Sequence, residues 1–157
     1  MSADCFDVFD SPLGPLYALA DARGALTELR LGGAPPPFPR DSRRLAEAHR
    51  QLDEYFAGRR RRFELELAPR GTPFQERVWQ ALLSIGYGEL ASYRGIAERI
   101  GRPGATRAVG RANGANRIPI VIPCHRVIAS DGSLGGYSGG LDMKVRLLAL
   151  EGHRYEV

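Results

Sequence analysis

The chain has few cysteines: its 157 residues include only Cys5 and Cys124. Two thiols are too few for a disulfide framework or for a zinc site made of four cysteines, and a reducing compartment leaves both unpaired. At least one free thiol is therefore available for chemistry, and we also expect no metal and no cofactor.

Long apolar runs are also missing. No segment approaches the length that spans a bilayer, and the chain does not open with the charged and then apolar stretch of a secretory signal. Its apolar and charged fractions, 43% and 25%, are those of a folded globular protein. These observations predict a cytoplasmic protein with no membrane partner.

The excess of positive charge lies in one half of the chain. Basic and acidic residues are equal in number in residues 1–70, so the formal net charge of +4 belongs to residues 71–157. Six arginines there follow one another with no acidic residue between them, namely Arg99, Arg102, Arg107, Arg111, Arg117 and Arg126. This pattern is typical of a surface that meets phosphates, although a merely solvated basic face remains the alternative.

Residues 1–70 have the pattern of a small α/β domain, with an antiparallel sheet and one helix. Short apolar segments at 16–20 and 26–31, separated by a turn-type cluster, predict a hairpin, and residues 6–9 are expected to pair alongside it. A helix is expected from a cap at Asp41 or Ser42 to a stop at Gly58. The alternation in residues 63–67 predicts a further strand.

Residues 71–157 predict a second, mainly helical domain. A capping box at residues 72–75 starts one helix, Ser92 can cap a second that stops at Gly101, and residues 105–113 form a third. Two short helices joined by a glycine-containing turn match a winged-helix-like helix-turn-helix, although any αα-hairpin would look similar. Small residues in the third helix, Ala108 and Gly110, permit close approach to a partner.

The most unusual segment is Ile-Pro-Ile-Val-Ile-Pro-Cys-His-Arg-Val, residues 118–127. Its β-branched residues and two prolines predict a rigid, extended and buried backbone that holds Cys124 in place. A lone intracellular cysteine is more often a small core residue, so the neighbours of Cys124 decide its role.

A nucleophilic cysteine needs a base, and His125 is the obvious candidate. Neighbouring side chains of an extended chain point to opposite sides, so we expect a water molecule to relay the proton between them. Glu151, at the end of the last predicted helix, is the acid that we choose to orient the histidine. The glycine-rich segment 131–140 lacks the lysine of a phosphate-binding loop and is interpreted as a pocket wall.

The Pro-Cys-His-Arg-Val motif at 123–127, preceded by Asn116 and followed by Gly-Gly-Tyr-Ser-Gly-Gly at 135–140, resembles the O6-alkylguanine-DNA alkyltransferase family. The resemblance covers residues 72–152, whereas the first 70 residues are similar only in layout. It implies a monomeric repair protein that extrudes an O6-alkylated guanine from double-stranded DNA and moves the alkyl group irreversibly to Cys124. O4-alkylthymine is a second lesion to test.

The resemblance also implies the role of each residue. Cys124 is the acceptor, His125 the base acting through water, Glu151 its partner, and Asn116 the residue that orders the cysteine region. Tyr93 assists nucleotide rotation and donates to the purine, Arg107 fills the vacated stack, Ser138 donates near O6, and Tyr137 forms the pocket wall. Ser92, Ala108, Gly110 and Arg111 complete the expected DNA-binding set, on a helix-turn-helix that enters the minor groove.

Two alternatives remain from the residues. One is a non-enzymatic module that binds alkylated lesions, as alkyltransferase-like proteins do, although those lack the cysteine that is present here. The other is a hydrolase that uses Cys124, His125 and Glu151.

Overall fold

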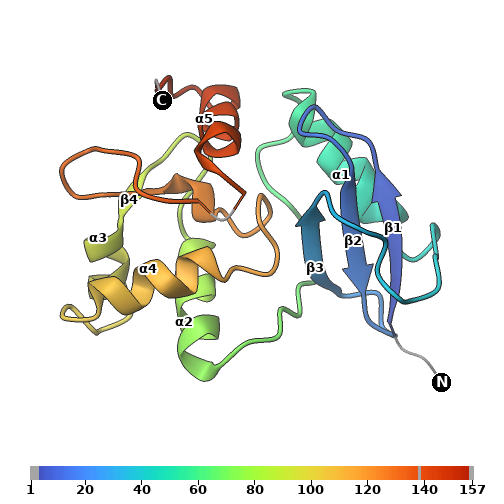
Figure 1. Ribbon diagram of the computed structural model, residues 1–157, viewed down its shortest axis with the longest axis horizontal. Helices are drawn as coiled ribbons and strands as arrows, with labels where there is room; N and C mark the ends of the chain where they lie inside the picture. Colours follow the sequence, from blue (N-terminus) through green and yellow to red (C-terminus); the bar gives the residue numbers. More distant parts are fainter. Residues whose placement is uncertain (1–3, 138, 156–157) are drawn as a thin grey trace. The chain divides into compact units, whose positions relative to one another are not determined.

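The structure is a computed structural model that describes residues 4–137 and 139–155. The chain divides into two compact units, residues 1–70 and 71–157 (Figure 1). Within the described ranges, none of the helices has the length and apolar content needed to cross a bilayer.

The first unit is built on a three-stranded antiparallel sheet. Its strands are β1 (Cys5–Phe9), β2 (Leu16–Ala20) and β3 (Leu26–Leu31), in the order β1-β2-β3. The Asp21 carboxylate accepts two backbone N–H groups of the β2–β3 turn, which closes the hairpin. The predicted hairpin and the pairing of the first strand beside it are therefore confirmed.

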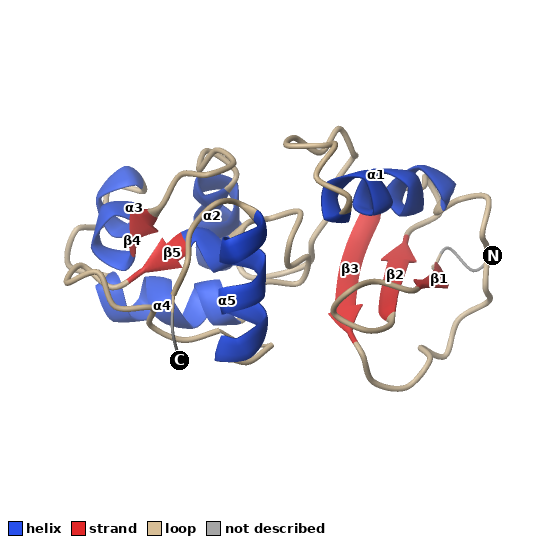
Figure 2. Cartoon of the chain, turned by 90° about the horizontal axis from the view of Figure 1, so that it is seen from above, coloured by secondary structure: helices blue, strands red, loops and turns tan. Residues whose placement is uncertain are grey.

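Helix α1 (Ala46–Phe56) lies across one face of this sheet (Figure 2). It buries Leu52 and Tyr55, and it ends before Gly58, whose φ of +76° is a left-handed conformation that glycine adopts readily. The expected start at Asp41 or Ser42 was too early. Asp41 accepts the backbone N–H of Arg44 and so closes a turn that precedes the helix.

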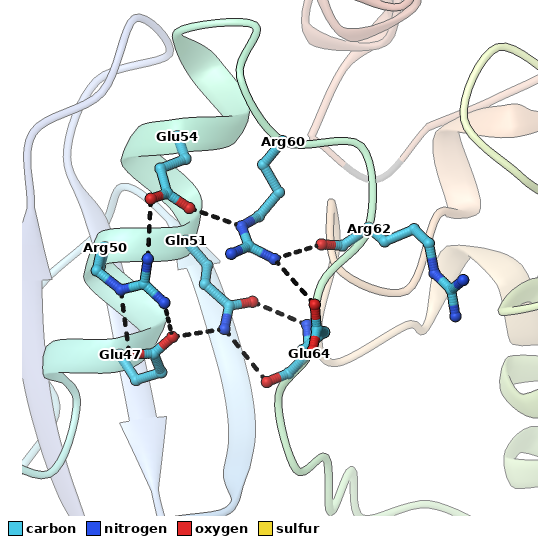
Figure 3. A network of polar contacts seen from close by, with 7 residues as sticks. All are labelled: Glu47, Arg50, Gln51, Glu54, Arg60, Arg62 and Glu64. Atoms are coloured by element: carbon cyan, nitrogen blue, oxygen red, sulfur yellow. Dashed lines mark hydrogen bonds and ion pairs between the residues drawn. The ribbon is translucent and has the colours of Figure 1, made fainter.

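Residues 63–67 do not form the predicted strand. The side-chain amide of Gln51 occupies both backbone groups of Glu64, with Nε2 3.2 Å from the carbonyl oxygen and Oε1 2.8 Å from the amide nitrogen (Figure 3). Only an isolated bridge joins Leu67 to Leu26. The alternation does correspond to half-burial of these residues, but the Gln51 side chain pairs with the Glu64 backbone where a partner strand would.

The second unit begins with α2 (Pro73–Leu82). The Thr72 hydroxyl accepts the backbone N–H of Gln75, and the Gln75 side chain accepts the N–H of Thr72, so the predicted capping box is confirmed. Helix α2 buries Trp79, whose indole Nε1 donates to the carbonyl of Ala112 at 2.8 Å. This bond ties α2 to the helix that contains Ala112.

A helix-turn-helix follows, made of α3 (Tyr93–Arg99) and α4 (Thr106–Gly114). Ser92 caps α3 by accepting the N–H of Gly95 at 2.8 Å, as predicted. Just before α3, the short strand β4 (Ala91–Ser92) pairs in parallel with β5 (Val127–Ile128). This pairing joins the helix-turn-helix to the segment that carries Cys124.

The last helix, α5 (Leu141–Leu150), ends where the sequence predicted. Glu151 is its C-terminal cap, and Gly152 follows with a φ of +102°. The inner face of α5 buries Lys144, Leu147 and Leu148. The end of this helix therefore brings Glu151 into the interior of the second unit.

Candidate active site

The segment before Cys124 is a turn, which corrects the prediction of an extended run. Residues 118–123 form no strand, and the N–H of Ile122 bonds the carbonyl of Ile118 at 2.9 Å. Ile120 has a φ of +75°, a strained value for a β-branched residue. Cys124–Arg126 then form a single 3₁₀ turn. We call residues 118–126 the cysteine turn.

Asn116 holds the cysteine turn together. Its Nδ2 donates to the carbonyl of Ile122 at 2.8 Å, and its Oδ1 accepts the N–H of Ile118 at 3.0 Å. Both bonds are buried, where they compensate backbone groups that no strand pairs. These contacts explain how a strained, proline-containing turn keeps one conformation.

Cys124 is buried, with an exposed fraction of 1%. Burial raises the pKa of its thiol, while a hydrogen bond with Asn116 and the positive charge of Lys144 act in the opposite direction. The thiol is therefore protonated at neutral pH, and it needs a base when it reacts.

His125 and Glu151 form a buried pair. Nε2 of His125 lies 2.8 Å from Oε2 of Glu151, and both side chains are inaccessible. Burial raises the pKa of the Glu151 carboxyl, but bonds from His125 and Arg126 outweigh it and bring that pKa to about 2. Because an ionised carboxylate only accepts, His125 carries its proton on Nε2.

The other ring nitrogen of His125 is then a proton acceptor. Nδ1 is buried and has no hydrogen-bond partner among residues 4–137 and 139–155. Burial lowers the pKa of His125 despite the neighbouring Glu151, so the imidazole is neutral at pH 7. A neutral imidazole with a free lone pair is the form that a general base requires.

Arg126 does not belong to the basic surface, which corrects the sequence prediction. It is 6% exposed, and its guanidinium bonds Glu151 at 2.7 Å and the carbonyl of Ile85 at 2.6 Å. The other five arginines of the run are exposed. The spacing of the arginines in the sequence did not distinguish the buried Arg126 from the five exposed arginines.

Lys144 is a functional residue that the sequence interpretation missed. Its ammonium group donates to the carbonyls of Val127 at 2.6 Å, Leu134 at 2.5 Å and Gly136 at 3.1 Å. It therefore ties the glycine-rich segment to β5, which directly follows the cysteine turn. Burial lowers the pKa of Lys144 to about 8. Its place on the buried face of a helix, next to Leu147 and Leu148, was the available signal.

A pocket of about 530 Å³ is lined in part by residues that neighbour Cys124. Its lining includes Tyr93, Gly110, Asn113 and Tyr137. Asn113 donates to the Cys124 carbonyl, and burial together with the neighbouring Cys124 raises the pKa of the Tyr137 hydroxyl. Asn113 thus contacts the backbone of Cys124, and Tyr137 neighbours its thiol.

The two lining tyrosines come from different segments, Tyr93 from α3 and Tyr137 from the glycine-rich segment. Tyr93 begins α3, and its hydroxyl reaches the carbonyl of Gly136 at 3.4 Å. A methyl group on Gly135 would lie 2.6 Å from the same hydroxyl, so only glycine fits here beside Tyr93. Burial raises the pKa of Tyr93, and its hydroxyl is a neutral donor at pH 7.

The remaining predicted residues are more scattered. Arg107 and Arg111 are exposed on α4, Ala108 is half-buried there, and the Ser92 hydroxyl caps α3. Ser138 lies outside the described residues. Asn113, to which the sequence interpretation gave no role, is 3% exposed and lines the pocket. The structure thus gathers Cys124, His125 and Glu151 in the interior of the second unit and leaves Arg107 and Arg111 on the surface.

Two family models cover nearly the whole chain. The DNA-binding domain of 6-O-methylguanine DNA methyltransferase matches residues 73–153, and the ribonuclease-like domain of the same protein matches residues 5–69. The chain belongs to the 6-O-methylguanine DNA methyltransferase family. The resemblance inferred from the Pro-Cys-His-Arg-Val motif is therefore confirmed.

Curated relatives agree with this family. The methylated-DNA–protein-cysteine methyltransferase of Mycobacterium leprae is 51% identical over 92% of this chain and 90% of its own length. That of Methanosarcina barkeri is 47% identical over 93% of this chain and 96% of its own length.

Solved structures share all or part of this fold. The Mycobacterium tuberculosis OGT in complex with DNA superposes with a TM-score of 0.87 at 49% identity, over 93% of this chain and 91% of that one. Schizosaccharomyces pombe Atl1, in complex with DNA containing O6-carboxymethylguanine, gives a TM-score of 0.50 at 32% identity over 56% of this chain and 84% of that one. The predicted architecture of two domains with a helix-turn-helix is confirmed.

Proposed function

We propose that this protein repairs DNA directly, by moving an alkyl group from O6 of guanine to Cys124 in a single turnover. The observation that carries the proposal is the buried thiol behind a pocket that is formed partly by the second helix of a helix-turn-helix. DNA is the partner that the family's DNA-binding domain model implies.

The chemistry begins with a proton transfer. Cys124 is protonated at rest, and Nδ1 of His125 is the acceptor, reached through one water molecule. Glu151 accepts Nε2–H of His125 and stabilises the imidazolium that forms, while Arg126 keeps Glu151 ionised. This division of roles is supported by the unpaired Nδ1 and by the low pKa of Glu151.

The thiolate then attacks the alkyl carbon. A sulfur–carbon bond forms as the carbon–O6 bond breaks, and the purine leaves with its negative charge spread over O6 and the ring. A proton from the imidazolium and a hydrogen bond from Tyr93 neutralise that charge. The product is a thioether, which has no acyl carbon for water to attack, so the protein is consumed.

Delivery of the base is assigned to the helix-turn-helix. Exposed arginines on α3, α4 and the turns beside them are available to phosphates, and the small residue Gly110 lets the duplex approach α4 closely. Arg107 fills the space that the extruded nucleotide leaves. Extrusion costs a few kcal/mol, and least when pairing is already damaged, which favours lesions over normal guanine.

The protein acts as a monomer in this proposal, since one chain holds the acceptor, base, acid and pocket. We also propose a cytoplasmic location, because the acceptor thiol must remain reduced.

The deciding experiment is mass spectrometry after incubation with a duplex that contains one O6-methylguanine. We expect Cys124 to gain one methyl group in place of its hydrogen, and Cys124→Ala to gain none. Binding of the lesion without any added mass would support the lesion-binding module instead. Repeated turnover of activated esters by the wild type, lost in Cys124→Ala, would support the hydrolase.

A further inference from the structure

Asn113 is a buried polar residue whose hydrogen bonds are incomplete. It lies in the last turn of α4, is 3% exposed and lines the pocket with Tyr93 and Tyr137. Its Nδ2 donates to the carbonyl of Cys124 at 3.3 Å. That bond sets the orientation of the amide, because the opposite orientation would place two oxygen atoms face to face.

The other end of the amide is an acceptor without a donor. Oδ1 of Asn113 is buried and has no hydrogen-bond partner in the described part of the chain. Buried polar atoms are nearly always paired, and an unpaired one reduces stability. Since Asn113 borders the pocket that we assign to the substrate, the missing donor is expected from the extruded base.

O6-alkylguanine has one kind of N–H group to offer. Alkylation of O6 leaves N1 without a hydrogen, N3 and N7 are acceptors, and N9 is bonded to the sugar. Only the 2-amino group remains as a donor. O4-alkylthymine offers no N–H donor, because its N3 has lost the hydrogen and its N1 is bonded to the sugar.

We propose that Oδ1 of Asn113 accepts a hydrogen bond from the 2-amino group of the extruded O6-alkylguanine, which makes Asn113 a specificity-determining residue that favours guanine over thymine lesions. This inference rests on the proposed function. Flipped bases are recognised by such bonds to their edges, and a site that pairs a donor discriminates against an analogue that lacks it.

The test compares two lesions that differ only in this group, O6-methylguanine and O6-methylhypoxanthine, each in the same duplex. Single-turnover rates of methyl transfer to Cys124 are measured for the wild type, for Asn113→Leu and for Thr106→Val, a second polar lining residue of α4. Because each duplex is used with every variant, differences in base-pair stability cancel in the comparison of ratios.

For the wild type we expect O6-methylguanine to react roughly three- to tenfold faster than the analogue. Asn113→Leu should bring that ratio close to one, whereas Thr106→Val should leave the ratio unchanged. If Asn113 only supports the Cys124 carbonyl, Asn113→Leu will slow both lesions equally and the ratio will persist, which overturns the proposal.

The wild type alone also tests the inference, should Asn113→Leu not fold. With each lesion placed opposite an abasic site, so that no base pair has to open, equal wild-type rates on the two lesions would overturn it, and so would loss of the ratio in Thr106→Val. Failure of the proposed function looks different, since no methyl group would then reach Cys124 from either lesion.

Discussion

The carboxylate of Glu151 lies 2.8 Å from Nε2 of His125 and 2.7 Å from Nε of Arg126, and it is inaccessible to solvent. One side chain thus orients the proposed base and neutralises a buried guanidinium. The two residues are neighbours in a 3₁₀ turn, so a single acid at the end of α5 reaches both.

Removing the charge of Glu151 should destabilise the second unit. Glu151→Gln leaves the Arg126 charge uncompensated in the interior, and we expect the free energy of unfolding to fall by about 3–5 kcal/mol. Urea unfolding followed by fluorescence of Trp79, the single tryptophan, reports on this unit. The double variant Glu151→Leu with Arg126→Met should lose less than the two single changes added together. Additive losses would contradict a buried ion pair.

The rate of transfer should depend weakly on pH near neutrality. Burial lowers the pKa of His125, so protonation removes the base only below the ordinary histidine value of about 6.5. Single-turnover rates at saturating DNA should stay level from pH 7.5 to 6.5 and decline at lower pH. A rate that rises about tenfold per pH unit in this range would indicate a thiol ionised by the solvent rather than by His125.

The lowered pKa of His125 also makes the stability of the fold depend on pH. The lowered pKa of His125 means that the unfolded chain binds a proton more readily than the folded chain. The stability from burying neutral His125 is therefore complete above pH about 6.5 and is lost as the pH falls toward the lower folded value. In the urea experiment, His125→Gln should show a smaller decrease in stability than the wild type between pH 7 and 5.

Loss of Lys144 should loosen the glycine-rich segment. Lys144→Met removes the donor of three carbonyls, and we expect transfer to slow by roughly ten- to a hundredfold, the effect of one hydrogen bond to a charged group. Amide hydrogen exchange in residues 133–137 should become faster. Arg146→Met, on the exposed side of the same helix, is the matched control and should change exchange there little. Unchanged exchange in Lys144→Met would contradict the assigned role.

Gly135→Ala should disturb Tyr93. The added methyl group would lie 2.6 Å from the Tyr93 hydroxyl, and the φ of +72° at this position is unfavourable for alanine by about 1–2 kcal/mol. We expect the free energy of unfolding to fall by that amount, and we expect transfer of the alkyl group from DNA to Cys124 to become slower. Gly136→Ala is the control for stability, because its methyl group would meet no atom within 4 Å. Equal stability of the two variants would argue against the contact.

Arg107→Ala should slow repair more than it weakens binding, because the side chain acts when the nucleotide is extruded. Its exposed position on α4 is compatible with this role. Single-turnover rates at saturating DNA, together with affinities at two salt concentrations, measure the two effects separately. Arg111→Ala, one helical turn further along, is the comparison. Equal repair rates for wild type and Arg107→Ala at saturation would contradict the assignment.

Several local features were predictable from residues alone. The capping box at Thr72, the cap at Ser92 and the turn at Asp21 depend on contacts between residues within four positions of each other. Hydrophobic periodicity located α2, α5 and the β2–β3 hairpin for the same reason. The Pro-Cys-His-Arg-Val motif then identified the family.

Sequence by itself thus determined the helices α2 and α5, the β2–β3 hairpin, the family and the choice of Cys124 as the proposed acceptor, because each depends on short-range spacing. Tertiary structure alone decided how Arg126 pairs with Glu151, how Lys144 reaches three carbonyls, and which end of the Asn113 amide is unpaired. It also made residues 118–123 a turn rather than a strand, since Asn116 supplies their backbone with side-chain partners. These contacts join groups whose burial and partners are set by the packing of the whole unit, and no local pattern records them.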